Sequence, residues 1–180
     1  MNEIIENTLK IEGGYVNDPD DRGAETYRGI SRRFHPEWKG WPIIDRYKQA
    51  QHFDPKLLDG NDELQRMVVV FYEEEYLSPF MELDDASIRA ELFDTAVNMG
   101  VGTASEMLQS ALNLMNRNGQ TFDDLVVDGD IGSKTLEAYE RSDKAILLKV
   151  LNGLQFMRYV EIVETDPRQE KFFNGWMRRV

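Results

Sequence analysis

Residues 12–30 read EGGYVNDPDDRGAETYRGI, and this stretch organises the chain on both sides of it. The glycine pair at positions 13 and 14 is expected to end a preceding helix, because glycine adopts the left-handed C-terminal conformation without penalty. The Asn, Asp, Pro and Gly residues that follow are turn formers. The stretch therefore predicts a short β-hairpin or turn region after the first helix, within residues 15–35.

Helical patterns cover most of the remaining chain. Asn2 can cap the first helix, and beyond residue 60 apolar residues recur with the helical period of about 3.6. Thr103 is expected to cap one of these helices, with Glu106 three residues later completing a capping box. The other predicted helices begin near Asp62, Ile88, Ser133 and Ser142, and a last short one follows Pro167. We therefore predict a mainly α protein.

The chain divides near residues 100–120, where glycines follow a predicted helix. No linker-like composition marks this seam, so two packed lobes are favoured over two free domains. We expect an N-terminal lobe of residues 1–100 and a helical C-terminal lobe of residues 101–180 packed on it.

Composition excludes several classes of function. The chain has 180 residues and no cysteine, which removes disulfide scaffolds, thiolate catalysis and Cys-ligated zinc. Two histidines are too few for most His-based metal sites, and we expect neither a metal ion nor another cofactor. A net charge of -12 argues against nucleic acid as a partner, because binding to phosphates rests on Lys and Arg. No apolar run approaches the roughly 20 residues of a membrane span, so we expect no stable membrane insertion.

Glu12 is the leading catalytic candidate from the residues alone. It follows an apolar helical face and lies near the negative end of the helix dipole, and both effects favour the protonated carboxyl. A glutamic acid kept neutral near pH 7 is suited to general acid catalysis, and the adjacent glycine pair lets backbone approach a ligand closely.

The stretch of residues 12–30 resembles the N-acetylmuramidases of glycoside hydrolase family 108, which are phage endolysins and bacterial relatives with a lysozyme-like helical fold. The family pattern reads Glu-Gly-Gly-Tyr, Asn-x-Pro-x-Asp, Gly-Gly-x-Thr and Gly-Ile, and this chain departs from it at Ala24, which replaces the second glycine of the third element. Residues 93–100 resemble the next family segment, and residues 127–136 resemble its C-terminal peptidoglycan-binding-type region.

The resemblance implies hydrolysis of the β-1,4 bond between N-acetylmuramic acid and N-acetylglucosamine in the glycan strands of peptidoglycan. Glu12 would protonate the glycosidic oxygen, Asp21 would be the second carboxylate, and Thr26 would hold a water or the substrate. Asp20 and Glu25 are alternative second carboxylates. A Glu after an apolar helix and an Asp in a polar turn would separate the two pKa values in the sense this reaction needs. Inversion is favoured over retention.

Two other functions stay open. A lytic transglycosylase needs one acidic Glu and no second carboxylate, and a non-catalytic wall-binding or secretion-accessory protein can use the same fold. The N-terminal segment MNEIIENTLK lacks the pattern of a secretory signal. We therefore expect the protein to be made in the cytoplasm and to act on the cell wall after release, for example through a phage membrane-pore protein. We also expect a monomer.

Substrate contacts are expected from aromatic and amide side chains. Trp38 and Trp41 lie in a Pro/Gly-rich stretch, where their rings either offer flat apolar faces to sugars or fold back onto the core. Asn98 offers the donor and acceptor that suit an acetamido group. The remaining candidates are Tyr15, Tyr27 and Asp94.

Overall fold

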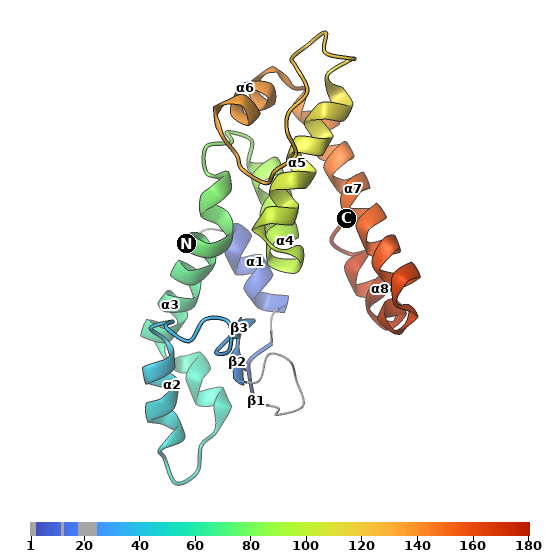
Figure 1. The fold of residues 1–180 in the computed structure, drawn as a ribbon. Coiled ribbons are helices and arrows are strands. Elements are labelled where there is room, and N and C mark those ends of the chain that lie inside the picture. The colour runs from blue at the N-terminus through green and yellow to red at the C-terminus, as the bar shows by residue number, and fades with distance from the viewer. Residues whose placement is uncertain (1–2, 12, 18–24) are drawn as a thin grey trace. The chain divides into compact units, whose positions relative to one another are not determined.

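Helices and one small antiparallel sheet make up the protein, as a computed structural model shows (Figure 1). The structure describes residues 3–11, 13–17 and 25–180, and Asn2, the expected cap of the first helix, lies outside this part of the chain. The chain forms two compact units, Met1–Glu75 and Tyr76–Val180. The expectation of a mainly α protein with strands just after the first helix is confirmed.

The first unit begins with α1 (Glu3–Ile11), which buries Ile5 and Thr8 on one face. A three-stranded sheet follows, with strands β1 (Tyr15–Asn17), β2 (Glu25–Tyr27) and β3 (Ile30–Ser31) in that order. The predicted hairpin is thus extended by a third strand. All neighbouring strands are antiparallel, so Tyr15 lies opposite Tyr27 and Thr26 lies opposite Ser31.

A two-residue turn joins β2 to β3 through Arg28 and Gly29, which have φ angles of 44° and 77°. Two positive φ angles in succession match the right-handed twist of the flanking strands. The non-glycine residue in this conformation is held from several sides: Arg28 N donates to Gly14 O at 3.2 Å, and Tyr72 Oη donates to Arg28 O at 2.9 Å. The guanidinium of Arg28 also pairs with Asp59 at 2.9 Å. The turn is therefore fixed against α3.

Helices complete the first unit. They are α2 (Trp41–Lys48), the 3₁₀ helix η1 (Pro55–Gly60) and α3 (Asp62–Tyr72), and α3 continues into the π-helical turn η2 (Glu73–Leu77). The sequence pattern did not predict α2, because the Pro/Gly-rich stretch around Trp38 and Trp41 is typical of a loop. Pro42 instead occupies the first turn of a helix, where its missing N–H costs nothing. Asn61 caps α3 by accepting from Leu64 N at 2.8 Å.

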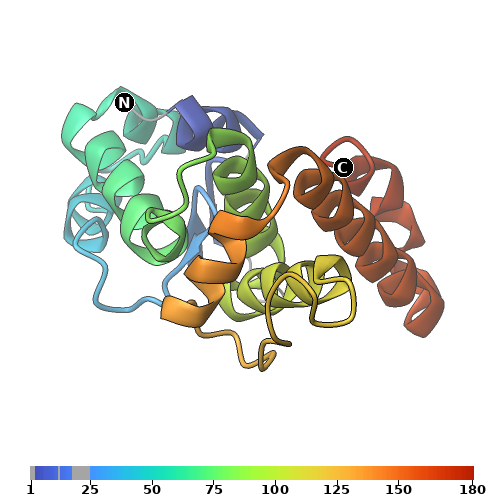
Figure 2. The same ribbon diagram turned by 90° about the horizontal axis from the view of Figure 1, so that it is seen from above.

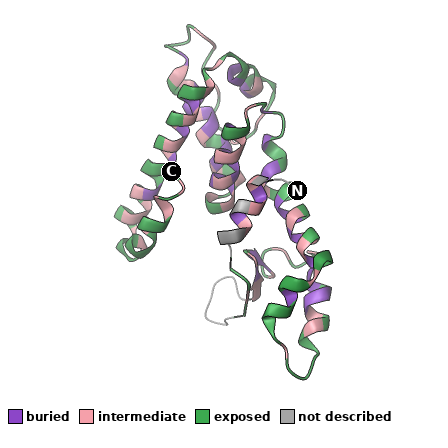
Figure 3. Ribbon diagram, turned by 180° about the vertical axis from the view of Figure 1, so that it is seen from behind, coloured by how far each residue is buried: buried purple, intermediate pink, exposed green. Residues whose placement is uncertain are grey.

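The second unit is an all-helical assembly. After the 3₁₀ turn η3 (Ser78–Phe80) come α4 (Ala86–Met99), α5 (Val101–Met115), α6 (Ser133–Arg141), α7 (Lys144–Thr165), the 3₁₀ turn η4 (Pro167–Gln169) and α8 (Glu170–Trp176). Apolar side chains of α4, α5 and α7 form its core, including Ile88, Leu92, Ala96, Leu108, Leu112 and Leu147 (Figure 3). Figure 2 shows α8 doubled back along α7, where Trp176 stacks on Tyr159 with ring centroids 4.9 Å apart.

The predicted cap of α5 is wrong. Gly100 separates α4 from α5 by a single residue, with φ 90° and ψ 151°, and α5 already begins at Val101. Thr103 therefore lies inside the first turn of the helix and caps nothing. The physical reason is that glycine can reverse the chain direction in one step, so the helix starts before it reaches the threonine.

A buried amide holds the long connection between α5 and α6. Gln109 Oε1 accepts from the backbone N–H groups of Asp128 at 3.0 Å and Gly129 at 2.9 Å. Its Nε2 donates to Asp128 Oδ1 at 2.8 Å and to Asp130 O at 2.9 Å. Gly129 has φ 77°, and an added Cβ would lie 3.4 Å from Gly102 O. One side chain of α5 thus fixes the segment that resembles the peptidoglycan-binding-type region.

None of the helices in the described part of the chain combines the length and the apolar character that crossing a bilayer requires.

Candidate active site

The sheet of the first unit carries the candidate catalytic residue that the structure describes. Thr26 lies at the centre of β2, half-buried, between Val16 of β1 and Ser31 of β3. Because side chains alternate along a strand, Thr26 faces the opposite side of the sheet from its neighbours Glu25 and Tyr27. Glu12, Asp20 and Asp21 lie outside the described residues.

Glu25 is the centre of an ionic network on the other side of the sheet. Its Oε1 accepts from Tyr15 Oη at 2.8 Å and from Lys48 Nζ at 2.7 Å. Its Oε2 lies 2.8 Å from Arg32 Nε, and Arg32 also binds Asp45 through two hydrogen bonds of 2.7 and 3.1 Å. A carboxylate that already contacts two cations and a phenol is better suited to joining β1, β2 and α2 than to activating water.

Electrostatics keep this network charged. The hydrogen bonds from Arg32 lower the pKa of Asp45, and the hydrogen bond to Glu25 raises the pKa of Lys48. Burial, followed by the hydrogen bond to Glu25, raises the pKa of the Tyr15 hydroxyl. Tyr15 therefore stays a neutral donor to Glu25, and its ring packs edge-on against Phe53 at 5.3 Å.

The aromatic candidates separate into buried and accessible residues. Tyr27 has 0% and Trp41 3% of its surface exposed, so neither ring has a free face to offer to a sugar. Trp38 is half-buried between them, with its ring centroid 6.4 Å from that of Tyr27 and 5.1 Å from that of Trp41. Trp41 also donates from Nε1 to His35 O at 2.7 Å, which fixes the loop that carries Trp38.

Gly40 makes room for the ring of Trp38, which gives a testable prediction. An added Cβ at Gly40 would lie 2.3 Å from Trp38 Cη2, although the backbone of Gly40 is ordinary right-handed helical. Gly40→Ala is therefore expected to displace the indole and to lower the free energy of unfolding by about 1–3 kcal/mol. Urea unfolding with tryptophan fluorescence measures both effects. Gly60→Ala is the matched control, because no atom lies within 4 Å of its added Cβ, and an equal loss in both variants would contradict the steric explanation.

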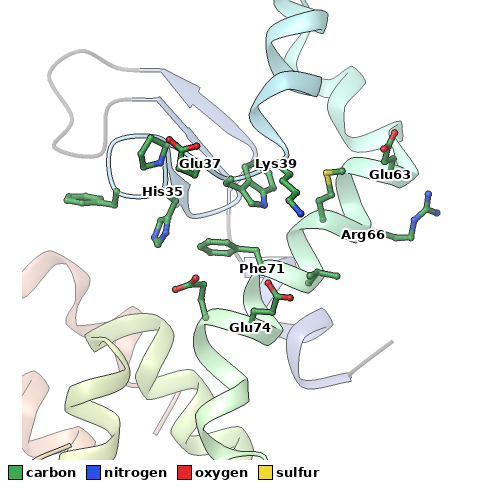
Figure 4. Close-up of a pocket in the computed structure, with 13 residues that line it drawn as sticks. His35, Glu37, Lys39, Glu63, Arg66, Phe71 and Glu74 are labelled. Carbon is green, nitrogen blue, oxygen red and sulfur yellow. The ribbon is translucent and has the colours of Figure 1, made fainter.

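A groove of about 750 Å³ opens beside this aromatic cluster. One wall is the loop of residues 34–39, and the other is the side of α3 and η2 that carries Met67, Val70 and Phe71. Figure 4 shows Lys39 and Phe71 reaching into the space between the two walls. The volume lies within the range of roughly 300–1,000 Å³ that is usual for small-molecule sites.

Asp94 and Asn98, the remaining substrate-binding candidates, lie on α4 of the second unit. Asp94 Oδ1 accepts from Arg179 at 2.6 Å and its Oδ2 accepts from Gln155 at 3.3 Å, so its carboxylate is tied to α7 and to the C-terminal segment. Asn98 is exposed and donates to Asp94 O at 2.7 Å, which leaves its amide oxygen available.

Glu91 lies one turn before Asp94 and is the most strongly perturbed carboxyl of this helix. Burial, and secondarily the charge of Asp94, raises the pKa of Glu91 to about 7. With its amide nitrogen turned toward α4, Asn152 of α7 donates to Glu91 Oε2 at 2.8 Å. No motif or spacing in the sequence marks Glu91 as a site residue.

The raised pKa of Glu91 predicts how stability depends on pH. The folded state holds a proton on Glu91 between the ordinary carboxyl pKa of 4.5 and about 7, so stability falls as pH rises through this window. Glu91→Gln should remove this loss and be more stable than wild type by about 1–3 kcal/mol at pH 8, with little difference at pH 5. Thermal unfolding at both pH values, with the exposed Glu140→Gln as control, tests this. A pH-independent difference would contradict it.

Within residues 3–11, 13–17 and 25–180, no three or more His, Asp or Glu side chains form a group that could hold a metal ion.

A mainly helical chain with a small antiparallel sheet directly after the first helix is the architecture of the lysozyme-like fold. The solved structure of SagA from Brucella abortus has a related fold: its TM-score with this chain is 0.61 at 21% identity, covering 98% of this chain and 87% of that one. No curated protein sequence matches the chain.

Residues 5–100 match the model of the glycosyl hydrolase 108 family, and the chain belongs to this family. Residues 103–180 match a second model, described as a predicted peptidoglycan domain. The resemblance found in residues 12–30, 93–100 and 127–136 is thereby confirmed. The protein is a glycoside hydrolase with peptidoglycan as its substrate.

Proposed function

We propose that this protein is an N-acetylmuramidase that hydrolyses the β-1,4 bond between N-acetylmuramic acid and N-acetylglucosamine and so lyses bacterial cell walls. The observation that carries this proposal is that the family segment of residues 5–100 contains the whole Glu12–Ile30 stretch. The arrangement of the described flanks supports it: α1 ends at Ile11, and Thr26 lies at the middle of β2, which begins at Glu25.

In the proposed mechanism Glu12 donates its proton to the glycosidic oxygen as the bond to the sugar breaks. Asp21 is the carboxylate that faces the developing positive charge and accepts the proton of the attacking water, with Asp20 as the alternative. Thr26 orients this water through its hydroxyl. Two carboxyl groups with separated pKa values are what this chemistry requires. The occupied oxygens of Glu25 favour Asp21 or Asp20 over Glu25 as the second carboxylate.

Substrate contacts are proposed for the accessible candidates. Trp38 would border the sugar chain with the exposed part of its ring, while Tyr27 and Trp41 support it from the core. Tyr15, whose hydroxyl binds Glu25, would support the site through that network. Asp94 and Asn98 of α4 stay proposed substrate contacts of the second unit, where the amide oxygen of Asn98 is available to a ligand. The catalytic work is proposed for residues 1–100 and wall binding for residues 101–180, in a monomer that acts on the wall after release from the cytoplasm.

Product analysis tests the proposal. Sacculi are digested with the wild-type protein, and the soluble fragments are examined by mass spectrometry after borohydride reduction. Reduced muramic acid ends are expected. Fragments with 1,6-anhydro ends would establish a lytic transglycosylase instead, and reduced glucosamine ends would place the cut on the other side of the sugar. Sedimentation with sacculi without any release of fragments would indicate a non-catalytic binding protein.

A further inference from the structure

The groove beside Trp38 is surrounded by charged side chains of both signs. Four glutamates and two cations line it, namely Glu37, Glu63, Glu74, Glu75, Lys39 and Arg66. None of the six forms an ion pair with another described residue, whereas Arg28, Arg32 and Lys48 of the same unit are all paired. Charges that no described residue neutralises remain available to a ligand.

Both walls of the groove carry exposed apolar side chains. Phe34 is 66% and Val70 47% exposed, so both could bury apolar surface against a ligand. The wall that carries Phe34 is held in place by turns, since His35 N donates to Ser31 O at 2.9 Å and the ring of His35 packs edge-on against Phe71 at 4.7 Å. A preformed groove with apolar walls and a few charged side chains is typical of a specific binding site.

The groove is connected to the candidate catalytic strand within one unit. The ring of Trp38 lines the groove and stacks on Tyr27, which directly follows Thr26 in β2. Tyr72 of α3, the helix that forms the other wall, donates to Arg28 O in the turn after β2. A ligand in the groove therefore contacts the elements that hold this strand.

We propose that this groove binds the stem peptide of peptidoglycan, and in particular a peptide that carries a free side-chain ammonium group. This inference rests on the proposed function. A glycan strand whose muramic acid carboxyls are amide-linked to peptide is uncharged, so unpaired charges offer it little. A stem peptide with a diamino acid carries carboxylates and an ammonium. Lys39, which reaches between the two walls (Figure 4), and Arg66 suit the carboxylates, and the excess of glutamates suits the ammonium.

The binding test uses three probes on the full-length wild-type protein. They are a tripeptide of Ala, γ-linked Glu and a diamino acid, the same tripeptide with its side-chain amine acetylated, and an uncharged chitin tetrasaccharide. The amine-bearing tripeptide is expected to bind saturably in calorimetry and to shift the NMR signals of Phe34 and Val70, two groove residues with no proposed contact to sugar, with acetylation weakening binding about 5- to 10-fold. No saturable binding, equal binding of the acetylated peptide, or shifts of the same signals by the tetrasaccharide would overturn the proposal.

Two double variants test whether the glutamates that line the groove cause the preference for the free amine. Glu74→Gln combined with Glu75→Gln should weaken the amine-bearing tripeptide about 5- to 10-fold and leave the acetylated peptide unchanged. The control removes the same charge at Glu73 and Glu140, which are exposed and do not line the groove. Equal weakening in both double variants would reduce the effect to net charge and overturn the site. Cleavage of peptide-free glycan strands is measured in parallel. If these strands are not cleaved, the proposed muramidase function is contradicted, while the result of the peptide-binding test still stands.

Discussion

Replacing Glu12 with glutamine is expected to lower the rate of fragment release from sacculi by a factor of about 10² to 10⁴, which is the range that a general acid contributes. Glutamine keeps the size and polarity of the side chain but has no proton of suitable acidity to give to the leaving oxygen. Binding to sacculi should persist, because the proton transfer is made in the transition state and adds little to ground-state binding. Rates of release and sedimentation with sacculi are the two measurements.

The control for this experiment is Glu6→Gln, which makes the same change of charge within α1. Both variants should unfold at the wild-type temperature, so that a loss of activity in one of them reports chemistry and not folding. If Glu12→Gln releases fragments at the parent rate, the acid is another residue. Asp21→Asn and Asp20→Asn then separate the two alternatives for the second carboxylate, since the one that matters should lower activity far more than the other.

Gln109→Ala is expected to destabilise the second unit by about 3–4 kcal/mol. The glutamine is 2% exposed and serves the backbone N–H groups of Asp128 and Gly129 and the carbonyl of Asp130. Its removal leaves these groups without partners and opens a cavity beside α5. The expected loss of stability is large for one substitution, because the conformation of residues 128–130 depends on the side chain of Gln109.

Chemical unfolding followed by circular dichroism measures this loss, with Gln120→Ala as the control at an exposed position of the same connection. Gln109→Glu is the informative third variant. It keeps an acceptor for the two N–H groups but places a carboxylate beside Asp128, whose own pKa is lowered by the hydrogen bond from Gln109. Its stability should therefore fall at neutral pH and recover partly in acid. If the alanine variant is as stable as wild type, the hydrogen bonds of Gln109 contribute no net stability.

The helices and the position of the sheet were predictable because the chain signals them locally. The glycine pair after α1, Asn61 before α3 and the apolar period in α4 and α7 each act over a few residues. The missed helix α2 and the wrong cap of α5 involve residues that are common in two kinds of local structure. Pro42 can stand in a loop or in the first turn of a helix, and its position in α2 is decided by the burial of Trp41 and Ile44 in the core. Thr103 has the side chain of a good helix cap, but α5 begins at Val101, directly after Gly100, so the helix starts before Thr103.

The site was predictable only where its residues adjoin in sequence. The stretch of residues 12–30 carries a recognisable pattern, and the family match covers it. The network around Glu25 includes Arg32, Asp45 and Lys48. Their spacing in the sequence follows neither the helical nor the strand period. These contacts could therefore not be predicted, because they form only when the fold brings β2 and α2 together. In the sequence Glu91 looks like an ordinary surface residue of a helix, because its raised pKa depends on burial that only the folded structure creates.

The single-residue joint at Gly100 has a consequence for how this protein can be truncated or recombined. The two family segments meet there, at residues 100 and 103, yet Ile88, Leu92 and Ala96 before the joint share one core with Leu108 and Leu147 after it. A fragment that stopped at the joint would expose the apolar side of α4 to water. Chimeras that exchange the C-terminal half between relatives would likewise have to inherit a matching α4 surface, so the two halves are expected to diversify together.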